Sequence, residues 1–159
     1  MEQLESMQPR LLVIDACVAR AAGGDPTRAG VSGACRRALE AALLRGHSVL
    51  MCKAMRDEWD KHQSGFARTW RAGMVARRRM KVFEPAECVV LREALAQLDA
   101  DSPVRKRVDK DVHVVEAGLG ADKTILTADA TIETDLEVVC PASATLQEIT
   151  WVYPCHCCA

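Results

Sequence analysis

Short apolar runs alternate along the chain with longer segments in which apolar residues recur every three or four positions. The short runs predict buried strands, and the longer spacing predicts helices with one apolar face. The expected strands lie at 10–16, 47–52, 81–85, 123–129 and 136–141. The expected helices lie at 31–46, 53–63, 65–80, 86–100 and 142–152, with a further one beginning at about Lys110. Segments 19–30 and 101–110 are expected to be loops.

The order of these segments predicts an α/β fold. Each expected strand is almost wholly apolar, which is typical of strands buried on both faces. Strands that alternate with helices form parallel sheets, so we expect a three-layer α/β/α sandwich. The 159 residues contain no repeat and no low-complexity linker, so we expect a single domain over 1–159. Ligands of such sheets bind at the carboxyl ends of the strands, which makes the residues after each strand the first candidates for a site.

The amino-acid composition limits the expected location and the expected kinds of binding partner, but it identifies no partner. Apolar residues make up 49% of the chain, charged residues make up 27%, and the formal net charge is −1. The whole molecule therefore has no strong attraction to polyanions or membranes, and local patches would have to bind them. No apolar run approaches the roughly 20 residues of a membrane span. The first ten residues lack a basic region followed by an apolar block, so we expect no signal peptide and a cytoplasmic location.

The eight cysteines divide into two groups. Five stand singly in apolar or helical segments and are expected to be small core residues: Cys17, Cys35, Cys52, Cys88 and Cys140. The other three lie with His156 in the ending CHCCA at 155–159. Ligand pairs of structural zinc sites are usually separated by two to four residues, and this cluster is tighter. We expect a flexible, exposed tail in preference to a zinc site.

Four acidic residues occupy places where the expected fold brings side chains together. Asp15 and Asp129 each end an apolar run, at the carboxyl ends of two strands expected to be central. Glu58 falls on the apolar side of its expected helix, and Asp111 falls within the apolar stripe of its own helix. Asp111 is also expected on the first helical turn, where the helix dipole favours a negative charge. The nearby Glu116 is expected on the opposite, solvent-facing side.

Acids gathered at one sheet edge repel one another, and some of them would have a raised pKa. A divalent cation removes that cost, and a small set of carboxylate oxygens suits Mg²⁺ or Mn²⁺. Such ions activate water and stabilise the charge that develops in phosphodiester hydrolysis. Each acid also has a simpler explanation, because Asp15, Asp111 and Asp129 could each cap a helix. The order and placement of all four favour a site.

These residues resemble the PIN-domain family, in which a strand ends in Asp, a Glu follows the second strand, an Asp stands at a helix start and a further strand ends in Ser/Thr-x-Asp. The matching segments are LLVIDACV with Asp15, MRDEWDKH with Glu58, KDVHVVEAGL with Asp111, and ILTAD with Thr127 and Asp129. The ending EITWVYP is also similar to the strand-like WVNP ending of many members. That similarity would turn the last part of the helix expected over 142–152 into a strand.

The resemblance spans residues 11–154 and implies a small prokaryotic PIN-like nuclease with a parallel sheet of about five strands. It implies that the four acids hold Mg²⁺ or Mn²⁺ and orient the attacking water, and that Thr127 supports them. It also implies ribonuclease activity. Many small members are toxins of toxin–antitoxin pairs, which makes an antitoxin-like protein inhibitor a candidate partner.

Basic residues close to these acids are candidates for contacts with RNA phosphates. They are Arg20, Arg105, Lys106, Arg107 and Lys110. The segment 68–81 is also basic, and Trp59 and Trp70 near its start could either stack bases or belong to the core. His62 shares the inward face with Glu58, as a partner of the acids or as an ordinary boundary histidine.

Two other functions compete with a nuclease. The chain could be a catalytically silent PIN scaffold that binds RNA or a protein. It could also be a phosphatase with Asp15 as nucleophile, although such enzymes usually place a second acid two residues on, where this chain has Cys17. A homodimer through the apolar helix 88–98 is a further hypothesis, and ordinary core packing explains that helix equally well.

Overall fold

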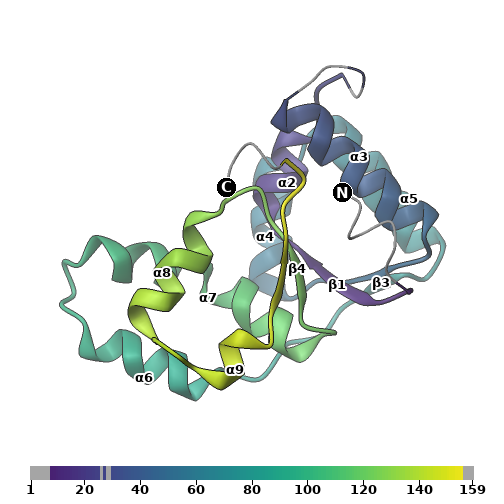
Figure 1. Cartoon of the computed structure of the whole chain (residues 1–159). Helices are drawn as coiled ribbons and strands as arrows, with labels where there is room; N and C mark the ends of the chain where they lie inside the picture. Colours follow the sequence, from purple (N-terminus) through teal and green to yellow (C-terminus); the bar gives the residue numbers. More distant parts are fainter. Residues whose placement is uncertain (1–7, 26, 28–29, 156–159) are drawn as a thin grey trace.

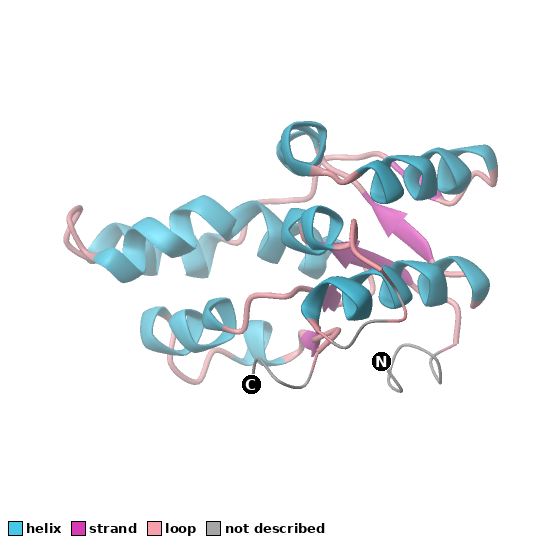
Figure 2. Ribbon diagram, turned by 90° about the horizontal axis from the view of Figure 1, so that it is seen from above, coloured by secondary structure: helices cyan, strands magenta, loops and turns pink. Residues whose placement is uncertain are grey.

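The computed structural model describes residues 8–25, 27 and 30–155 of the chain. Five strands form a parallel sheet in the order β3-β2-β1-β4-β5. They are β1 (Leu11–Ile14), β2 (Ser48–Leu50), β3 (Met80–Lys81), β4 (Thr124–Leu126) and β5 (Thr150–Val152). Helices cover both sides of the sheet (Figure 1, Figure 2), which confirms the prediction of a three-layer α/β/α sandwich.

The helices of the described residues are α2 (Ala16–Ala21), α3 (Val31–Leu44), α4 (Lys53–His62), α5 (Gly65–Ala76), α6 (Val89–Gln97), α7 (Pro103–Gly120), α8 (Thr131–Val139) and α9 (Ala144–Gln147). Several of them pack in two groups. α7 packs on the central strands β1 and β4, and both α6 and α8 pack against α7. α3 contacts α2 and α5, and α5 contacts β3. None of the helices in the described residues combines the length and apolar character that a membrane span requires.

The core explains the two tryptophans. Trp59 and Trp70 are buried, and their ring centroids lie 6.0 Å apart. Trp59 Nε1 donates a hydrogen bond to the carbonyl oxygen of Ile14 at 3.1 Å, and Trp70 Nε1 donates to that of Leu39 at 2.6 Å. Both polar atoms are thereby satisfied within the core. Of the two roles expected for these residues, the structure selects core packing over base stacking.

The strand expected at 136–141 is wrong, because most of this run belongs to α8. The buried side chains of α8 are Ile132, Asp135, Leu136 and Val139, which are three or four positions apart as in a helix. A short apolar run does not by itself distinguish a strand from a buried helix. The fifth strand lies later, at β5, and α9 precedes it, so the helix expected over 142–152 is wrong in its second half. A strand at this place agrees with the similarity of EITWVYP to the PIN ending.

The loop expected at 101–110 is also wrong, because it forms the first half of α7. Ser102 Oγ accepts a hydrogen bond from the backbone N–H of Arg105 at 3.3 Å, and Pro103 occupies the first turn. A serine cap followed by proline is a common helix start. Two smaller differences occur elsewhere. β3 begins one residue before the expected segment 81–85 and ends at Lys81, and the short helix α2 was not expected.

The sheet has a topological switch point between β1 and β4. The chain moves outward from β1 to β2 and β3, and then returns across the sheet to β4 and β5. The backbone N–H of Asp15 donates to the carbonyl oxygen of Leu126 at 3.0 Å, which holds the two strand ends together. The crevice outside the carboxyl ends of such a strand pair is the usual ligand site of open α/β sheets.

Among the described cysteines, Cys35, Cys52 and Cys140 are buried, as expected of small core residues. Cys88 is a half-buried free thiol that precedes α6. The structure describes only Cys155 of the tail. The expected flexible tail over 155–159 otherwise lies outside the described residues.

Candidate functional site

A pocket of about 400 Å³ opens at the carboxyl ends of β1 and β4. All four acids singled out in the sequence line it. We call it the acidic pocket, and its lining is Asp15, Ala16, Cys17, Arg20, Ala21, Val31, Glu58, His62, Lys110, Asp111, Ala128 and Asp129. These residues come from α2, α3, α4, α7 and the segment after β4. The fold therefore brings together side chains that are distant in the sequence.

A hydrogen-bond network joins the ends of the two central strands. Thr127 Oγ1 donates to Asp15 Oδ2 at 2.9 Å and accepts from the backbone N–H of Asp129 at 3.1 Å. Cys17 Sγ donates to the same Asp15 Oδ2 at 3.1 Å and accepts from the backbone N–H of Ala128 at 3.3 Å. Thr127, which is fully buried, thus supports the acids as expected.

Cys17 is the residue of this network that sequence reasoning missed. It was expected to be a core residue, but it lines the acidic pocket. Burial, and next the negative charge of Asp15, raise the pKa of the Cys17 thiol to about 12. The thiol therefore keeps its proton at neutral pH and can donate to Asp15. Its position two residues after Asp15, on the first turn of α2, is the signal that points to it.

Asp111 is the acid whose environment is most strongly perturbed. Burial raises its pKa from the ordinary value of 3.8 to about 6, and the charges of Asp15, Asp129 and Glu58 add to that rise, against a lowering effect from Lys110. All three other acids are therefore close enough to act on it. The expected help from the helix dipole is absent, because α7 begins at Pro103 and Asp111 lies more than two turns inside it.

α7 reaches this position because it approaches β4 closely. A Cβ atom on Gly118 would lie 2.5 Å from Cδ1 and 2.7 Å from Cγ1 of Ile125, a residue of β4 that is fully buried. Only glycine fits at this contact without displacement. The close packing of α7 on the sheet thus determines how deep Asp111 lies in the acidic pocket.

α4 brings Glu58 and His62 to the opposite wall of the pocket. Trp59, the neighbour of Glu58, anchors α4 to the end of β1 through its bond to Ile14. Glu58 is half-buried, as its inward position predicts. His62 is exposed at the rim rather than packed in the core, and it lines the pocket as its pairing with Glu58 suggests.

Two of the four acids also cap local structure, as the alternative explanation foresaw. Asp15 Oδ1 accepts from the backbone N–H of Cys17 at 3.3 Å at the start of α2. Asp129 Oδ1 accepts from the backbone N–H of Thr131 at 2.9 Å and from its hydroxyl at 2.7 Å. Asp111 is no cap, and neither Asp111 nor Glu58 accepts a hydrogen bond from another residue in the described part of the chain. The capping explanation, which was offered for Asp15, Asp111 and Asp129, therefore fails for Asp111.

The expected phosphate contacts separate into two groups. Arg20 and Lys110 line the acidic pocket. Arg105, Lys106 and Arg107 lie on α7 instead of a loop, and each is engaged elsewhere. Arg105 pairs with Asp109 and donates to the Leu98 carbonyl, Lys106 pairs with Asp101, and Arg107 binds both oxygens of Asp135. Arg107 lines a small adjoining cavity, which shares Lys110, Asp111 and Asp129 with the acidic pocket.

Glu116 was expected to face solvent, and this expectation is wrong. Its side chain is buried and accepts from Arg92 Nε at 2.7 Å, from Arg92 Nη2 at 2.9 Å and from the backbone N–H of Cys88 at 2.8 Å. Burial by itself raises the pKa of Glu116, but these bonds outweigh it and hold that pKa below its usual range. Because α6 and α8 cover this face of α7, a residue opposite the sheet is still buried.

The four acids share a pocket, but they do not surround one point. Among the described residues, no three Asp, Glu, His or Cys side chains are gathered closely enough to hold a metal ion between them. The comparisons add no relative, since no protein-family model, curated protein or solved structure matches the chain.

Proposed function

We propose that this protein is a metal-dependent endoribonuclease of the PIN type that works in the cytoplasm. One observation carries the proposal: four carboxylates from distant parts of the chain line one pocket at the switch point of the sheet, where burial, and next the charges of the other acids, raise the pKa of Asp111. The mutual repulsion of acids in one pocket opposes folding, and a ligand of opposite charge relieves that repulsion. A cation is such a ligand.

The chemistry of these donors suits Mg²⁺ or Mn²⁺, which prefer carboxylate oxygens. Because the four acids do not surround one point in this structure, Asp15, Glu58, Asp111 and Asp129 would have to move closer together to hold the ion. The bound ion would supply an activated water and a positive charge for phosphodiester hydrolysis. Thr127 and Cys17 hold the Asp15 carboxylate in place through their two bonds to Oδ2. Lys110 and Arg20, at the pocket lining, supply positive charge for the RNA phosphates.

RNA as the substrate rests on the resemblance to the PIN family, as does an antitoxin-like inhibitor. The free thiols among the described cysteines suit the reducing cytoplasm. The homodimer through α6 stays a hypothesis. Leu91 and Leu95 of this helix are buried in the core, whereas Val89 and Val90 are 61% and 53% exposed.

A catalytically silent scaffold is the second candidate. The capping bonds of Asp15 and Asp129 favour it, because these two acids have structural roles that need no metal. This candidate predicts RNA or protein binding that survives the loss of one acid. The nuclease candidate predicts a metal site that is lost when one of its acids is removed.

The first experiment is a calorimetric titration of metal-free protein with Mn²⁺, beside Asp111→Asn and Asp15→Asn. The control is Asp109→Asn, which changes an exposed acid of the same helix α7 outside the pocket. The proposal expects saturable Mn²⁺ binding by the wild type and the control, and at least about tenfold weaker binding by the two pocket variants.

The second experiment measures Mn²⁺-dependent cleavage of a fluorescent single-stranded RNA by the same proteins. The nuclease is supported if cleavage is lost in Asp111→Asn and Asp15→Asn and kept in Asp109→Asn. Equal cleavage by Asp111→Asn and the wild type would contradict it. RNA binding with neither metal uptake nor cleavage would select the silent scaffold.

A further inference from the structure

A cluster of cations occupies the end of the sheet opposite the acidic pocket. We call it the basic corner, and it consists of Arg10, Arg45, Arg77, Arg78, Arg79 and Lys81. Arg10 precedes β1, Arg45 follows α3 just before β2, and residues 77–81 connect α5 to β3 and include its last residue. The five arginines therefore lie before the strands that follow them, and Lys81, the last residue of the two-residue β3, donates from Nζ to the Arg78 carbonyl at 3.0 Å and lines a shallow cavity with Arg10. The four acids line the pocket at the carboxyl ends of β1 and β4.

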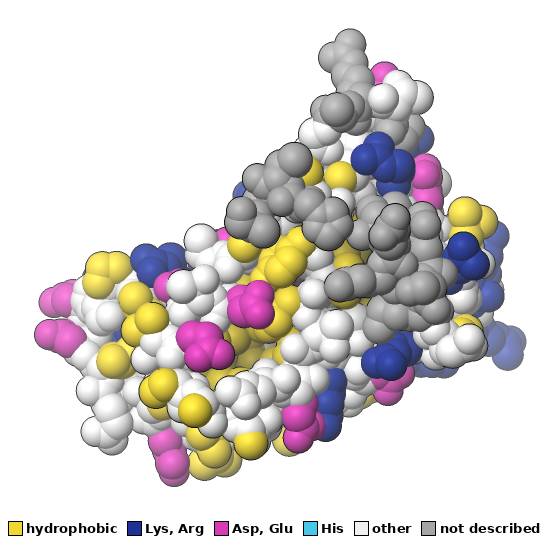
Figure 3. Space-filling view, viewed as in Figure 1, with side chains coloured by type: hydrophobic (Ala, Val, Ile, Leu, Met, Phe, Trp, Pro, Cys, Tyr) yellow, Lys and Arg dark blue, Asp and Glu magenta, His cyan; other side chains and the backbone are white. Residues whose placement is uncertain are grey.

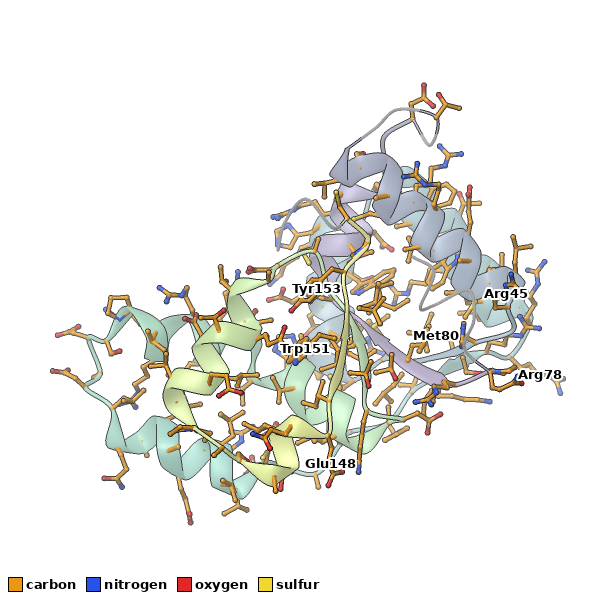
Figure 4. All side chains as sticks on the ribbon, in the orientation of Figure 1. Arg45, Arg78, Met80, Glu148, Trp151 and Tyr153 are labelled. Carbon is orange, nitrogen blue, oxygen red and sulfur yellow. The ribbon has the colours of Figure 1, made fainter. Side chains whose placement is uncertain are left out.

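The basic corner is open and lacks compensating acids. Arg79 is half-buried, and the other five side chains are exposed. In the described part of the chain, none of the six forms an ion pair, whereas Arg71, Arg92 and Arg107 each pair with an acid. Figure 3 shows dark blue side chains gathered at the right of the molecule, over the ends of α3 and α5, and Figure 4 places Arg45 and Arg78 there.

Two neighbouring features bear on the charge of the basic corner: one nearby acid and the C-terminal ends of two helices. Asp122 is exposed at the same edge, but its Oδ2 accepts the backbone N–H of Leu11 at 2.7 Å and it is one charge against six. The C-termini of α3 and α5 also end here, and each helix dipole favours a nearby cation. The dipoles explain about one cation per helix end. The formal net charge of the chain is −1, so this concentration of cations leaves the remainder of the molecule negative.

Arg78 is held in a backbone conformation that ordinarily selects glycine. Its φ is 56°, at the position just after the C-cap of α5, and Gly46 occupies the corresponding position after α3 with φ 82°. A side chain in this region costs about 1 kcal/mol relative to glycine. Its neighbour Arg79 donates to the Leu43 carbonyl at 2.9 Å, which fixes the turn against α3. The charge of Arg78 is thus kept on a rigid turn where glycine would be more stable.

We propose that the basic corner binds the sugar–phosphate backbone of a single-stranded RNA, as a second contact remote from the acidic pocket. Five of its six cations are arginines, whose guanidinium groups bind phosphate oxygens in pairs. The choice of RNA rests on the proposed function. The affinity for a polyphosphate backbone depends only on the cluster itself.

The geometry sets a minimum length for RNA that touches both sites. α5 begins three residues after His62 at the acidic pocket, and its 12 residues end at the basic corner. This helix is about 18 Å long at about 1.5 Å per residue. One strand of a stacked B-form helix rises about 3.4 Å per nucleotide, so a stacked strand needs roughly six nucleotides to reach from one site to the other, and an extended strand needs fewer. RNA too short to span this distance can contact the basic corner only by itself.

The test uses the full-length protein in EDTA, where cleavage does not occur, and fluorescence anisotropy of labelled oligouridines of about 20 and about 4 nucleotides. The corner variant is Arg45→Gln/Arg78→Gln. The control is Lys53→Gln/Arg56→Gln, which removes the same charge from exposed residues of α4 outside both sites. We expect the corner variant to bind the long RNA at least about tenfold more weakly, with a salt dependence smaller by about 1.4 in log–log slope.

The short RNA carries fewer phosphates, so we expect it to bind more weakly than the long RNA, to lose affinity in the corner variant and to keep it in the control. Arg78→Gly separates binding from folding, because it relieves the left-handed conformation. We expect it to melt at a temperature no lower than the wild type and still to bind the long RNA more weakly. Wild-type affinity in the corner variant, or an equal loss in the control, would overturn the proposal. Binding to phosphatidylserine vesicles without binding to RNA, lost in the corner variant, would reassign the surface to a membrane.

The two proposals can fail separately. If the wild type binds long RNA through the basic corner but neither takes up Mn²⁺ nor cleaves, the nuclease proposal fails and this one stands. If it cleaves a tetranucleotide with Mn²⁺ and the corner variant binds long RNA as the wild type does, this one fails and the nuclease proposal stands.

Discussion

Asp111 is half-buried among like charges, and this position has a cost for folding. A carboxyl whose pKa is 3.8 when unfolded and about 6 when folded binds more protons in the folded state between these two values. Stability therefore decreases as the pH rises from about 4 to about 6, and the loss persists above that. At neutral pH the loss is at most about 3 kcal/mol.

We therefore expect Asp111→Asn to raise the free energy of unfolding of the metal-free protein at pH 7.5, by about 1–3 kcal/mol, and to leave it nearly unchanged at pH 4. Urea unfolding in EDTA at the two pH values measures this. Asp109→Asn is the control, and its change is expected to stay within about 0.5 kcal/mol. A destabilised Asp111→Asn at pH 7.5 would mean that the carboxylate has a stabilising partner.

Cys17 gives a second prediction at the scale of single residues, because serine and alanine separate its hydrogen bond from its volume. We expect Cys17→Ala, which removes the donor to Asp15, to weaken Mn²⁺ binding by about tenfold or more. Cys17→Ser keeps a donor and is expected to stay within about threefold of the wild type. Calorimetry measures both, with Cys140→Ala as a buried cysteine outside the pocket. If serine were as weak as alanine, packing and not hydrogen bonding would explain Cys17.

At the scale of elements, the contact between α7 and β4 controls the depth of Asp111. Gly118→Ala places a Cβ within 2.7 Å of two side-chain atoms of the fully buried Ile125, so α7 must shift outward. We expect a loss of about 1–3 kcal/mol in unfolding free energy and weaker Mn²⁺ binding. Gly65→Ala, in α5, has nothing within 4 Å of the new Cβ and is expected to be neutral or stabilising. Equal effects of the two substitutions would contradict this account.

Which elements were predictable from the sequence depends on how specific their pattern is. β1 and β4 are short, almost fully buried and bounded by polar residues, so their apolar runs identify them and place Asp15 and Asp129 correctly. Residues 136–141 have an equally apolar run, and only tertiary packing makes it part of α8. The start of α7 at Ser102 and Pro103 was legible as a helix cap, but the basic residues that follow suggested a loop.

The acidic pocket was predictable for a related reason. The positions of the four acids follow from where strands end and which way helix faces point, and the spacing of apolar residues predicts both well. These acids are Asp15, Glu58, Asp111 and Asp129. The role of Cys17 and the burial of Glu116 depend on contacts between elements, which periodicity does not contain. Arg105, Lys106 and Arg107 were displaced from the site because a helix, unlike a loop, sends neighbouring side chains in different directions.

At the scale of the whole molecule, opposite charges are collected at the two ends of one sheet. The acidic pocket lies at the carboxyl ends of the strands and the basic corner at the amino ends, with α5 running between them. A molecule of formal net charge −1 thus has an acidic pocket at one end and a basic corner at the other. In the proposed nuclease, the pocket would hold the metal and the corner would hold a second part of the RNA.

The proposed metal site would couple this arrangement to the stability of the whole fold. At a Mn²⁺ concentration about 100 times the dissociation constant, binding to the folded state adds about 2.7 kcal/mol. For a chain of 159 residues, this corresponds to a rise of roughly 5–10 °C in melting temperature. The proposed ion would bind the ionised carboxylates, and protons would compete with it at Asp111, whose pKa burial raises to about 6.

We therefore expect the Mn²⁺-dependent rise to be full above about pH 7, to shrink as the pH falls through 6, and to disappear with EDTA. Thermal unfolding of the wild type, Asp111→Asn and Asp109→Asn, with and without Mn²⁺ at pH 5 and 7.5, measures it. Asp111→Asn begins from a higher melting temperature without metal, because its repulsion is relieved, and gains less from Mn²⁺. A rise of the same size at both pH values, or in both variants, would place the ion on the outer surface and not among the acids of the pocket.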